Sequence, residues 1–347
     1  MKDIRHITEE ELEKFIKNIG EKPFRTKQIK EWLWKKGSHS FDEMANLSLS
    51  LRQKLTDTFT FHQLSIAKNV KSSDGTEKML FRLSDSHLVE GVLIPTSNRV
   101  TACISSQVGC PLQCRFCATG QGGYVRNLHF SEIYDQFLLM NQQSLLSFQK
   151  GISNIVFMGM GEPLLNYENV KQTILLLTSP HGQGWSPTRI TLSTVGIVDK
   201  IQQLAEDLPN VGLAISLHTA DPQKRLQLMP VTATNSLPKL QEALVNYVRK
   251  TNHRVSIEYL LLGNLTDSLQ DADQLLRFCK PFPVKINLIQ YNATDSIFLK
   301  STLEKTETFA NYLISKNLIV TIRQSRGEDI AAACGQLATQ NFRILFN

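Results

Sequence analysis

The sequence is 347 residues long, with a mass of 39.2 kDa and 41% apolar residues, which suffices for one large globular domain and a smaller one. Residues 1–20 are charged, and no run of about eighteen uncharged apolar residues occurs. We therefore expect no membrane association and a cytoplasmic location, where six cysteines are more typical of metal binding or redox chemistry than of structural disulfides. The net charge of +6 favours a polyanionic partner.

Residues 1–60 are predicted to form a small helical domain. Thr8 and Glu11 have the spacing of a capping box, and an apolar stripe at helical spacing follows up to Gly20. The stretch KPFRTKQIKEWLWKK at 22–36 then carries six basic residues and one acidic residue, interleaved with aromatic residues. This composition is typical of RNA recognition, because basic side chains neutralise phosphates and rings stack on bases. The alternative is a helical core with a solvated lysine face, which we favour for the tryptophans, whereas the basic residues fit both interpretations.

Residues 61–95 are predicted to be a β-rich connector, because KMLFRLSDSHLVEGVLIP at 78–95 alternates apolar and polar positions around a turn at 84–86. From 96 to 347 the pattern changes. Runs typical of strands begin at 100, 154, 189, 211, 254, 284 and 318, and segments with a helical period separate them. This alternation predicts an α/β fold with a parallel sheet covered by helices, as in a complete or partial (β/α) barrel. In such folds the loops after the strands carry the chemistry.

Three cysteines follow the first of these strands with the spacing C-x3-C-x2-C: Cys110, Cys114 and Cys117. Glycine and proline residues around them indicate a looped backbone that can direct three thiolates at one centre. A zinc site, a four-cysteine iron–sulfur cluster and a three-cysteine cluster with one open iron all remain possible on these residues. A fourth ligand would have to come from Cys103, Cys279 or Cys334.

The sequence around this motif resembles the RlmN/Cfr family of radical S-adenosylmethionine (SAM) RNA adenine methyltransferases. C-x3-C-x2-C with Phe116 before the last cysteine resembles the radical SAM hallmark. The family stretches, in chain order, are FRTKQIKEWLWKKG, SSQVGCPLQCRFCATG, GGYVRNL, MGMGEPLLN, TLSTVG, AISLH and RGEDIAAACGQL. The resemblance implies a partial (β/α)6-type radical SAM barrel with a small helical N-terminal domain at 1–60, a short β-rich connecting segment at 61–95 and a core at 96–347.

The resemblance also implies the cofactors and their ligands. Cys110, Cys114 and Cys117 are expected to hold a 4Fe-4S cluster, whose open iron binds SAM. A carboxylate at a strand end suits the SAM ammonium group, and neighbouring glycine permits close approach of the backbone. The residues expected to bind SAM are Gly161, Glu162, Ser193, Ser216, Leu217, His218 and Asn292.

Three further residues are expected to be catalytic by the same resemblance. Cys334 would carry the methyl group as S-methylcysteine, and two SAM molecules would be used per turnover. Cys103 would then attack the Cys334 sulfur, release the RNA and form a transient disulfide. Glu90 would accept a proton, although a glutamate near a strand end is more often solvated. Cys279 matches no motif, and we expect it to pack in the core.

The resemblance thus implies a methyltransferase that modifies carbon 2 of an adenosine in 23S rRNA and in tRNA. An electron donor such as flavodoxin or ferredoxin is implied, and we expect a monomer. One alternative is a Cfr-type enzyme that methylates carbon 8 and confers resistance to antibiotics. The other alternative, from a different class, is a zinc-containing RNA-binding protein without catalytic activity.

Overall fold

The computed structural model describes residues 1–294 and 297–338. Its N-terminal part contains the helices α1 (Glu9–Asn18), α2 (Phe24–Trp34) and α3 (Leu49–Thr58), preceded by the 3-10 turn η1 (Ile4–His6). The short strands β1 (Lys2–Asp3) and β2 (Phe59–Thr60) pair in parallel and close this unit. The capping box is present, because Thr8 Oγ1 accepts from the Glu11 amide at 3.1 Å and the Glu11 carboxylate accepts from the Thr8 amide at 2.7 Å.

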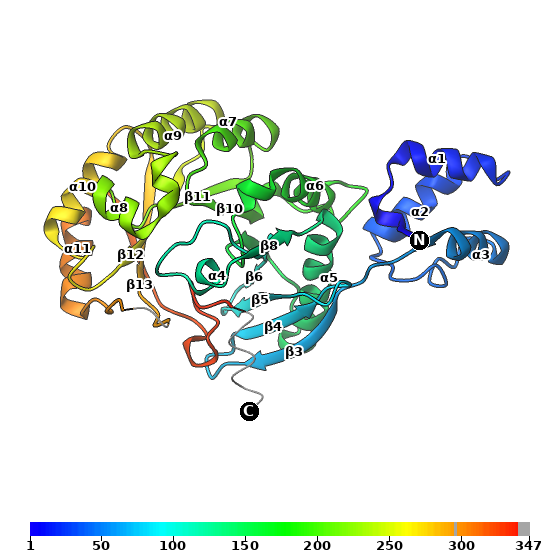
Figure 1. Ribbon diagram of the computed structural model, residues 1–347, viewed down its shortest axis with the longest axis horizontal. Helices are drawn as coiled ribbons and strands as arrows, with labels where there is room; N and C mark the ends of the chain where they lie inside the picture. The colour runs from blue at the N-terminus through cyan, green and yellow to red at the C-terminus, as the bar shows by residue number, and fades with distance from the viewer. Residues whose placement is uncertain (295–296, 339–347) are drawn as a thin grey trace.

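The tryptophans of α2 pack rather than project into solvent. Trp32 lies partly buried against the apolar core of the helical unit, and Trp34 contacts both this core and the larger one of the barrel. Figure 1 shows the three helices set to one side of the main body, next to α5 (Phe130–Phe148). The packing interpretation of the tryptophans is therefore confirmed.

One ten-stranded sheet organises the rest of the chain, in the order β14-β13-β12-β11-β10-β9-β6-β5-β4-β3. Seven of its strands are parallel, and they coincide with the seven predicted runs. These strands are β6 (Val100–Cys103), β9 (Asn154–Phe157), β10 (Ile190–Thr194), β11 (Gly212–Ser216), β12 (Val255–Leu261), β13 (Val284–Gln290) and β14 (Ile319–Arg323). The predicted partial barrel with a helical N-terminal region is confirmed.

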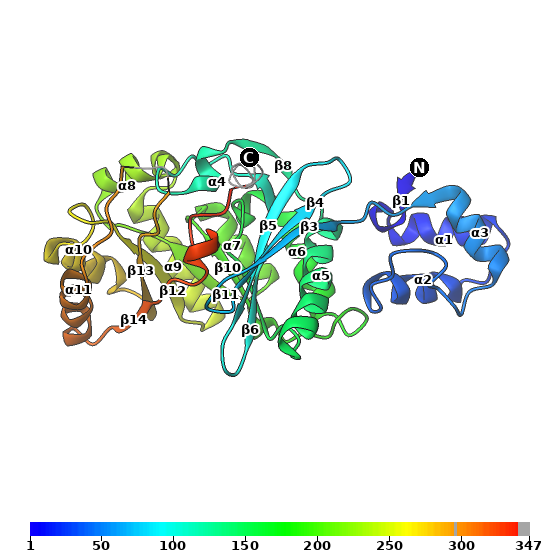
Figure 2. The same ribbon diagram turned by 90° about the horizontal axis from the view of Figure 1, so that it is seen from below.

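The β-rich segment extends this same sheet. Its strands β3 (Ser65–Lys71), β4 (Glu77–Arg82) and β5 (Leu88–Pro95) form an antiparallel meander, and β5 pairs with β6. The turn predicted at 84–86 joins β4 to β5, with Ser86 at φ 69°. In Figure 2 these strands run across the barrel between α5 and the C-terminal segment. The meander thus brings residues 72–78 beside residues 327–331.

Helices cover the outside of the parallel strands, as Figures 1 and 2 show. The covering helices are α5, α6 (Tyr167–Thr178), α7 (Val198–Asp207), α9 (Leu237–Thr251), α10 (Leu269–Cys279) and α11 (Leu303–Ser315). Shorter elements lie in the loops after strands: β7 (Gln107–Gly109), α4 (Ala118–Gln121), β8 (Tyr124–Asn127), α8 (Pro222–Leu228) and the 3-10 turns η2 (Pro163–Asn166), η4 (Pro230–Ala233) and η5 (Glu328–Ile330). The 3-10 turn η3 (Pro187–Arg189) instead leads from α6 into β10.

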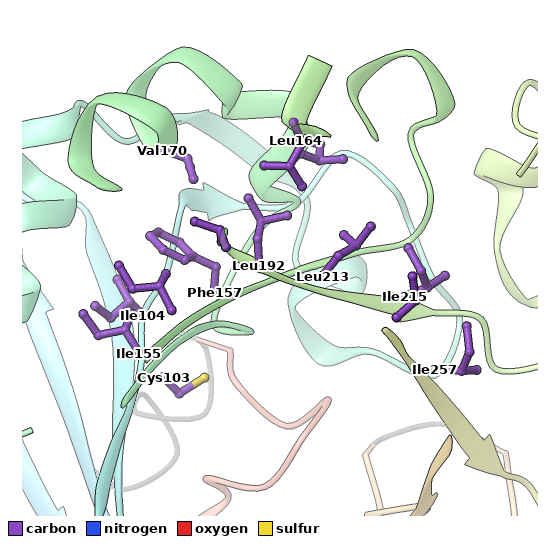
Figure 3. Packing of buried hydrophobic residues seen from close by; sticks show 14 of the residues in the cluster. Cys103, Ile104, Ile155, Phe157, Leu164, Val170, Leu192, Leu213, Ile215 and Ile257 are labelled. Carbon is purple, nitrogen blue, oxygen red and sulfur yellow. The ribbon is translucent and has the colours of Figure 1, made fainter. Parts of the chain in front are cut away.

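Apolar side chains of neighbouring strands form the core between sheet and helices. Figure 3 shows Ile155, Phe157, Leu192 and Leu213 packed together, as expected for parallel strands buried on both faces. Cys103 lies at the edge of this cluster, and Cys279 is 1% exposed within the core, as expected. Among the helices of residues 1–294 and 297–338, none is long and apolar enough to cross a membrane.

Candidate active site

The cysteine loop begins where β7 ends. Gly109 has φ 75°, and a Cβ atom there would lie 2.0 Å from the Gly123 carbonyl oxygen, so only glycine fits. That carbonyl instead accepts from the Cys110 amide at 2.8 Å. A tight turn follows, in which the Cys117 amide donates to the Cys114 carbonyl at 3.1 Å before α4 begins. These bonds fix the backbone of all three cysteines.

The three cysteines line one cavity of about 980 Å³ at the carboxyl ends of the parallel strands. Burial raises the pKa of the Cys110 thiol to about 12 and raises that of Cys114 further, with the charges of the other two cysteines adding to the latter shift. The protein alone therefore keeps these thiols protonated. A metal centre that binds here displaces their protons and supplies the positive charge that stabilises thiolates.

Gly161 and Glu162 lie on the same cavity wall, after β9. Gly161 has φ 97°, and a Cβ atom there would meet Gln107 Cβ at 2.5 Å. The buried Glu162 carboxylate accepts from the Leu164 amide at 3.0 Å and from the Val195 amide at 2.9 Å. Burial nevertheless raises the pKa of Glu162 to about 7. This carboxylate is thus held rigidly where a cationic ligand group would stabilise its charged form.

The ends of β10 and β11 contribute a polar pair and a histidine. Ser193 Oγ lies 3.3 Å from Ser216 Oγ, and both residues line the cavity. His218 also lines it with φ 60°, its ring set edge-on to Phe116 at 4.8 Å between centroids. The buried His218 Nδ1 has no hydrogen-bond partner among the described residues, and burial lowers its pKa to about 3. Leu217, in contrast, is fully buried in the apolar core and does not line the cavity.

Cys334 reaches this cavity from the far end of the chain. It lines both the first cavity and an adjoining one of about 800 Å³, where Cys103 and Asn292 also lie. The Asn292 amide donates to the Cys334 carbonyl at 3.3 Å and accepts from Ser325 Oγ at 2.6 Å, so its contacts hold the backbone of the Cys334 segment. All six cysteines are free thiols, and no disulfide links Cys103 to Cys334.

Glu90 is completely buried, not solvated as an isolated glutamate near a strand end would be. Neither of its carboxylate oxygens has a hydrogen-bond partner among the described residues, and burial raises its pKa to about 7. In the β5–β6 register Val92 is opposite Cys103, and Glu90 is two residues from Val92 on the same strand. Glu90 and Cys103 therefore share one face of the sheet, although Glu90 lines neither cavity.

Sequence reasoning missed two charged residues of the site. Arg323 at the end of β14 lines both cavities, and its guanidinium lies 3.2 Å from the Glu258 carboxylate on β12. The Arg323 charge acts to lower the pKa of Cys334, against burial, which has the larger effect and raises it. The available signal was Glu258 itself, an isolated acid in the apolar strand RVSIEYLLL.

Comparisons with known proteins agree with this geometry. Residues 2–60 match the family model described as "Ribosomal RNA large subunit methyltransferase N-terminal domain", and residues 104–279 match "Radical SAM superfamily". A relative from Christiangramia forsetii, named "Probable dual-specificity RNA methyltransferase RlmN", is 48% identical over 98% of this chain and 97% of its own length. The chain belongs to the RlmN family of radical SAM RNA methyltransferases.

A second relative and a solved structure give the same result. A relative of the same name from Cytophaga hutchinsonii is 46% identical over 99% of this chain and 94% of its own. The crystal structure of a radical SAM methyltransferase from Sphaerobacter thermophilus superposes with a TM-score of 0.90 at 35% identity, covering 97% of this chain and 99% of that one. The RlmN-family fold therefore extends over nearly the whole chain.

The radical SAM family implies a 4Fe-4S cluster and SAM, and the residues of this cavity fit both. Three thiols face one concave space whose wall also carries Glu162, Ser193 and His218. The unpartnered Nδ1 of His218 and the rigid Glu162 carboxylate offer polar contacts to a ligand. Over residues 1–294 and 297–338, no group of three or more His, Cys, Asp or Glu side chains converges as a site for one metal ion.

Proposed function

We propose that this RNA methyltransferase modifies carbon 2 of an adenosine in 23S rRNA and in tRNA, with Cys334 as the carrier of the methyl group. The observation that carries the proposal is the wall that Cys334 shares with Cys110, Cys114 and Cys117. The names of the relatives support an RlmN-type enzyme with two RNA specificities. The packing of the Cys334 segment against α4 gives further support: the Ala118 amide donates to the Gly335 carbonyl at 2.8 Å.

In this proposal Cys110, Cys114 and Cys117 hold the cluster, and Glu162 accepts the ammonium group of SAM. When bound, the cluster and SAM supply a one-electron cleavage that yields a 5′-deoxyadenosyl radical. Ser193, Ser216 and the neutral His218 are placed to orient the ligand by hydrogen bonds. The polar end of the cavity thus fixes SAM, while the apolar wall excludes water from the reacting atoms.

Cys334 receives the methyl group in the first half of the reaction. Its thiolate attacks the methyl carbon of one SAM, a carbon–sulfur bond forms and S-adenosylhomocysteine leaves with the electron pair. Arg323 favours the thiolate that this step needs, because its charge acts to lower the pKa of Cys334 against the larger effect of burial. A second SAM then serves for hydrogen abstraction from the new methyl group, so that two SAM molecules are used per turnover.

Release of the product is assigned to Cys103 and Glu90. Burial raises the pKa of Cys103 to about 12, so the residue remains a protonated thiol until a base accepts its proton. Glu90, with a pKa of about 7 on the same sheet face, suits a proton acceptor at neutral pH. The methylene radical on the Cys334 sulfur would add to the adenine carbon, and loss of the ring proton to Glu90 and of one electron to the oxidised cluster would leave the RNA attached through a carbon–sulfur bond. Attack of the Cys103 sulfur on the Cys334 sulfur would break that bond, the carbon would leave with the electron pair and take up a proton as the new methyl group, and the resulting transient disulfide would be reduced by a cellular thiol.

The helical N-terminal region is proposed to bind the RNA. On α2 Phe24 and Lys27 are exposed, and so is Lys36 just after the helix, whose ammonium lies 3.6 Å from the centroid of the Trp32 ring. Cations beside aromatic rings suit phosphates and unpaired bases. We further propose that a flavodoxin or ferredoxin supplies electrons and that the enzyme acts as a monomer.

The test is methylation by the anaerobically reconstituted enzyme of rRNA and tRNA that lack the modification. Mass spectrometry of the digested RNA is expected to show 2-methyladenosine, whereas 8-methyladenosine would establish the Cfr-type alternative. Cys114→Ala is expected to lose iron and activity. Cys279→Ala, which removes a buried thiol outside the cavity, is the matched control and should retain iron. A colourless wild-type protein with stoichiometric zinc would instead support the RNA-binding alternative.

A further inference from the structure

Helix α8 contains a buried arginine that the reaction described above does not use. Arg225 has 0% exposure and is the largest fully buried side chain among the described residues. Its guanidinium donates to the Val195 carbonyl at 2.6 Å, to the Leu217 carbonyl at 3.3 Å and to Thr232 Oγ1 at 3.0 Å. All three acceptors are neutral. These hydrogen bonds give each guanidinium nitrogen one acceptor, but they do not balance the positive charge of Arg225.

No carboxylate of residues 1–294 or 297–338 forms an ion pair with Arg225. The other strongly buried arginine, Arg5, has two such partners, Asp3 and Asp135. Removing an ion from water has a large cost in free energy unless a counter-charge or a strong polar environment offsets it. The described residues around Arg225 therefore lack an anion that would compensate it.

The neighbours of α8 indicate where that anion belongs. Leu228 and Met229 follow Arg225 by three and four residues at the end of α8. They pack in one apolar cluster with Cys114 and Phe116. The Leu228 carbonyl accepts from the Arg115 amide at 3.0 Å, so α8 supports the middle of the cysteine loop. Burial lowers the pKa of Arg225 to about 10. The charge of Cys114 acts in the opposite direction and raises it. The side chain is therefore still cationic at neutral pH.

We propose that Arg225 is the fixed counter-charge of the iron–sulfur centre and makes that centre easier to reduce. This assignment rests on the proposed function in one respect, that Cys110, Cys114 and Cys117 hold the cluster. A cluster bound by three thiolates is anionic, and reduction adds one more negative charge. A buried cation behind one ligand stabilises the reduced form more than the oxidised form, because the interaction grows with the negative charge and is little screened.

Arg225 is a positioning residue in this proposal, since it lies behind the cysteine loop and does not line the cavity. A purely structural role makes a different prediction. If the guanidinium only ties the ends of β10 and β11 to α8, its loss lowers stability and leaves the reduction potential of the cluster unchanged. The potential therefore separates the two roles, whereas activity alone does not.

The experiment compares wild type with Arg225→Met, Arg225→Gln and Arg225→Lys as full-length chains reconstituted anaerobically. Electron paramagnetic resonance follows the reduced cluster during a redox titration, with iron and sulfide measured in the same samples. Because this signal comes only from loaded protein, incomplete loading does not alter the measured midpoint. We expect both neutral variants to have a more negative midpoint potential than wild type and Arg225→Lys to restore it toward the wild-type value.

Thr232→Val is the matched control, because it removes one hydrogen bond of Arg225 and keeps the charge. It is expected to lower the melting temperature without moving the potential. A wild-type potential in Arg225→Met or Arg225→Gln would overturn the assignment of Arg225 alone. A wild-type chain that binds no iron under the same conditions would contradict the proposed function, and the two failures are therefore distinguishable.

Discussion

At the scale of single residues, the site contains two buried carboxyl groups, Glu162 and Glu90, whose ionisation burial makes unfavourable. Glu162 has backbone donors on both oxygens, whereas Glu90 has none among the described residues. Both have a pKa of about 7, but their surroundings differ, and so do the groups that can stabilise each charged carboxylate. A cationic ligand can stabilise Glu162 in the cavity, whereas Glu90 lies outside both cavities, where burial raises its pKa and the charge of Lys78 offsets only part of that effect.

We predict that Glu90→Gln stabilises the protein above neutral pH and impairs RNA methylation. Because the pKa of Glu90 rises from 4.5 to about 7 on folding, the folded chain retains a proton that the unfolded chain releases. The free energy of unfolding of the wild type therefore falls as the pH rises from 4.5 to about 7, whereas that of Glu90→Gln does not. The gain at pH 8 is at most about 3 kcal/mol. Urea unfolding at pH 5 and pH 8 measures it, and an equal difference at both pH values would contradict the prediction.

The same variant is expected to reduce RNA methylation about 100-fold while methylation of Cys334 remains near the wild-type rate. Intact-protein mass spectrometry follows Cys334, and digested RNA gives the product. Glu77→Gln is the control on the neighbouring strand β4, because the Glu77 carboxylate is also buried but has Asn69 and Gln143 as donors. That variant should leave both steps intact.

At the scale of elements, the turn between β3 and β4 clasps the segment that carries Cys334. Asp329 accepts from Ser72 Oγ at 2.5 Å and from the Ser73 amide at 3.0 Å, and Asp74 accepts from the Gly327 amide at 3.0 Å. Lys78 on β4 donates to the Ala331 carbonyl at 3.1 Å. The meander that extends the sheet therefore also holds the segment that carries Cys334 beside the cavity.

We predict that Asp329→Ala slows methylation of Cys334 about tenfold, because the loosened segment spends less time at the cavity. Hydrogen exchange of residues 326–338 is expected to quicken, with the remaining sheet unaffected. Glu328→Ala is the matched control, since its half-exposed carboxylate has only Lys300 at 3.9 Å as a partner. Unchanged exchange in Asp329→Ala would show that the clasp does not order the segment.

The clasp also shows where prediction from the sequence ends. Each parallel strand was visible as a short apolar run, because strands and helices are encoded locally. The contact of Asp329 with Ser72 was not, because it joins residues from opposite ends of the chain. The burial of Glu90 and the isolation of Arg225 are likewise results of long-range packing, and neither DPQKRLQL nor HLVEGVLIP differs in pattern from an ordinary surface helix or strand.

At the scale of the whole molecule, a buried ionic network joins the helical N-terminal region to the barrel. Arg5 donates to both carboxylate oxygens of Asp135 on α5 at 2.7 Å, and it also binds Asp3 and the His62 carbonyl. Beside it, the Trp34 ring lies 5.6 Å from that of Tyr134, whose hydroxyl donates to the Trp34 carbonyl. Figure 1 shows the three N-terminal helices beside α5, the helix that carries Asp135 and Tyr134.

We predict that Arg5→Met separates RNA recognition from the chemistry of the barrel. The substitution leaves Asp135 buried without its partner, at a cost of about 3–5 kcal/mol, so the junction opens while the barrel retains its own core. Methylation of Cys334, which needs only the barrel, should persist, whereas RNA methylation falls through a raised KM for RNA. Limited proteolysis is expected to cut between residues 60 and 65.

Lys2→Ala is the control for this junction, since it breaks the exposed ion pair with Glu11 nearby and should change neither step. Adding Asp135→Leu to Arg5→Met should recover part of the stability, because one of the two buried carboxylates that lose Arg5 is then removed and only Asp3 remains without it. If Cys334 methylation and RNA methylation fall together in Arg5→Met, the helical region supports the barrel itself. In that case its role in placing RNA over the cavity would have to be assigned to other contacts.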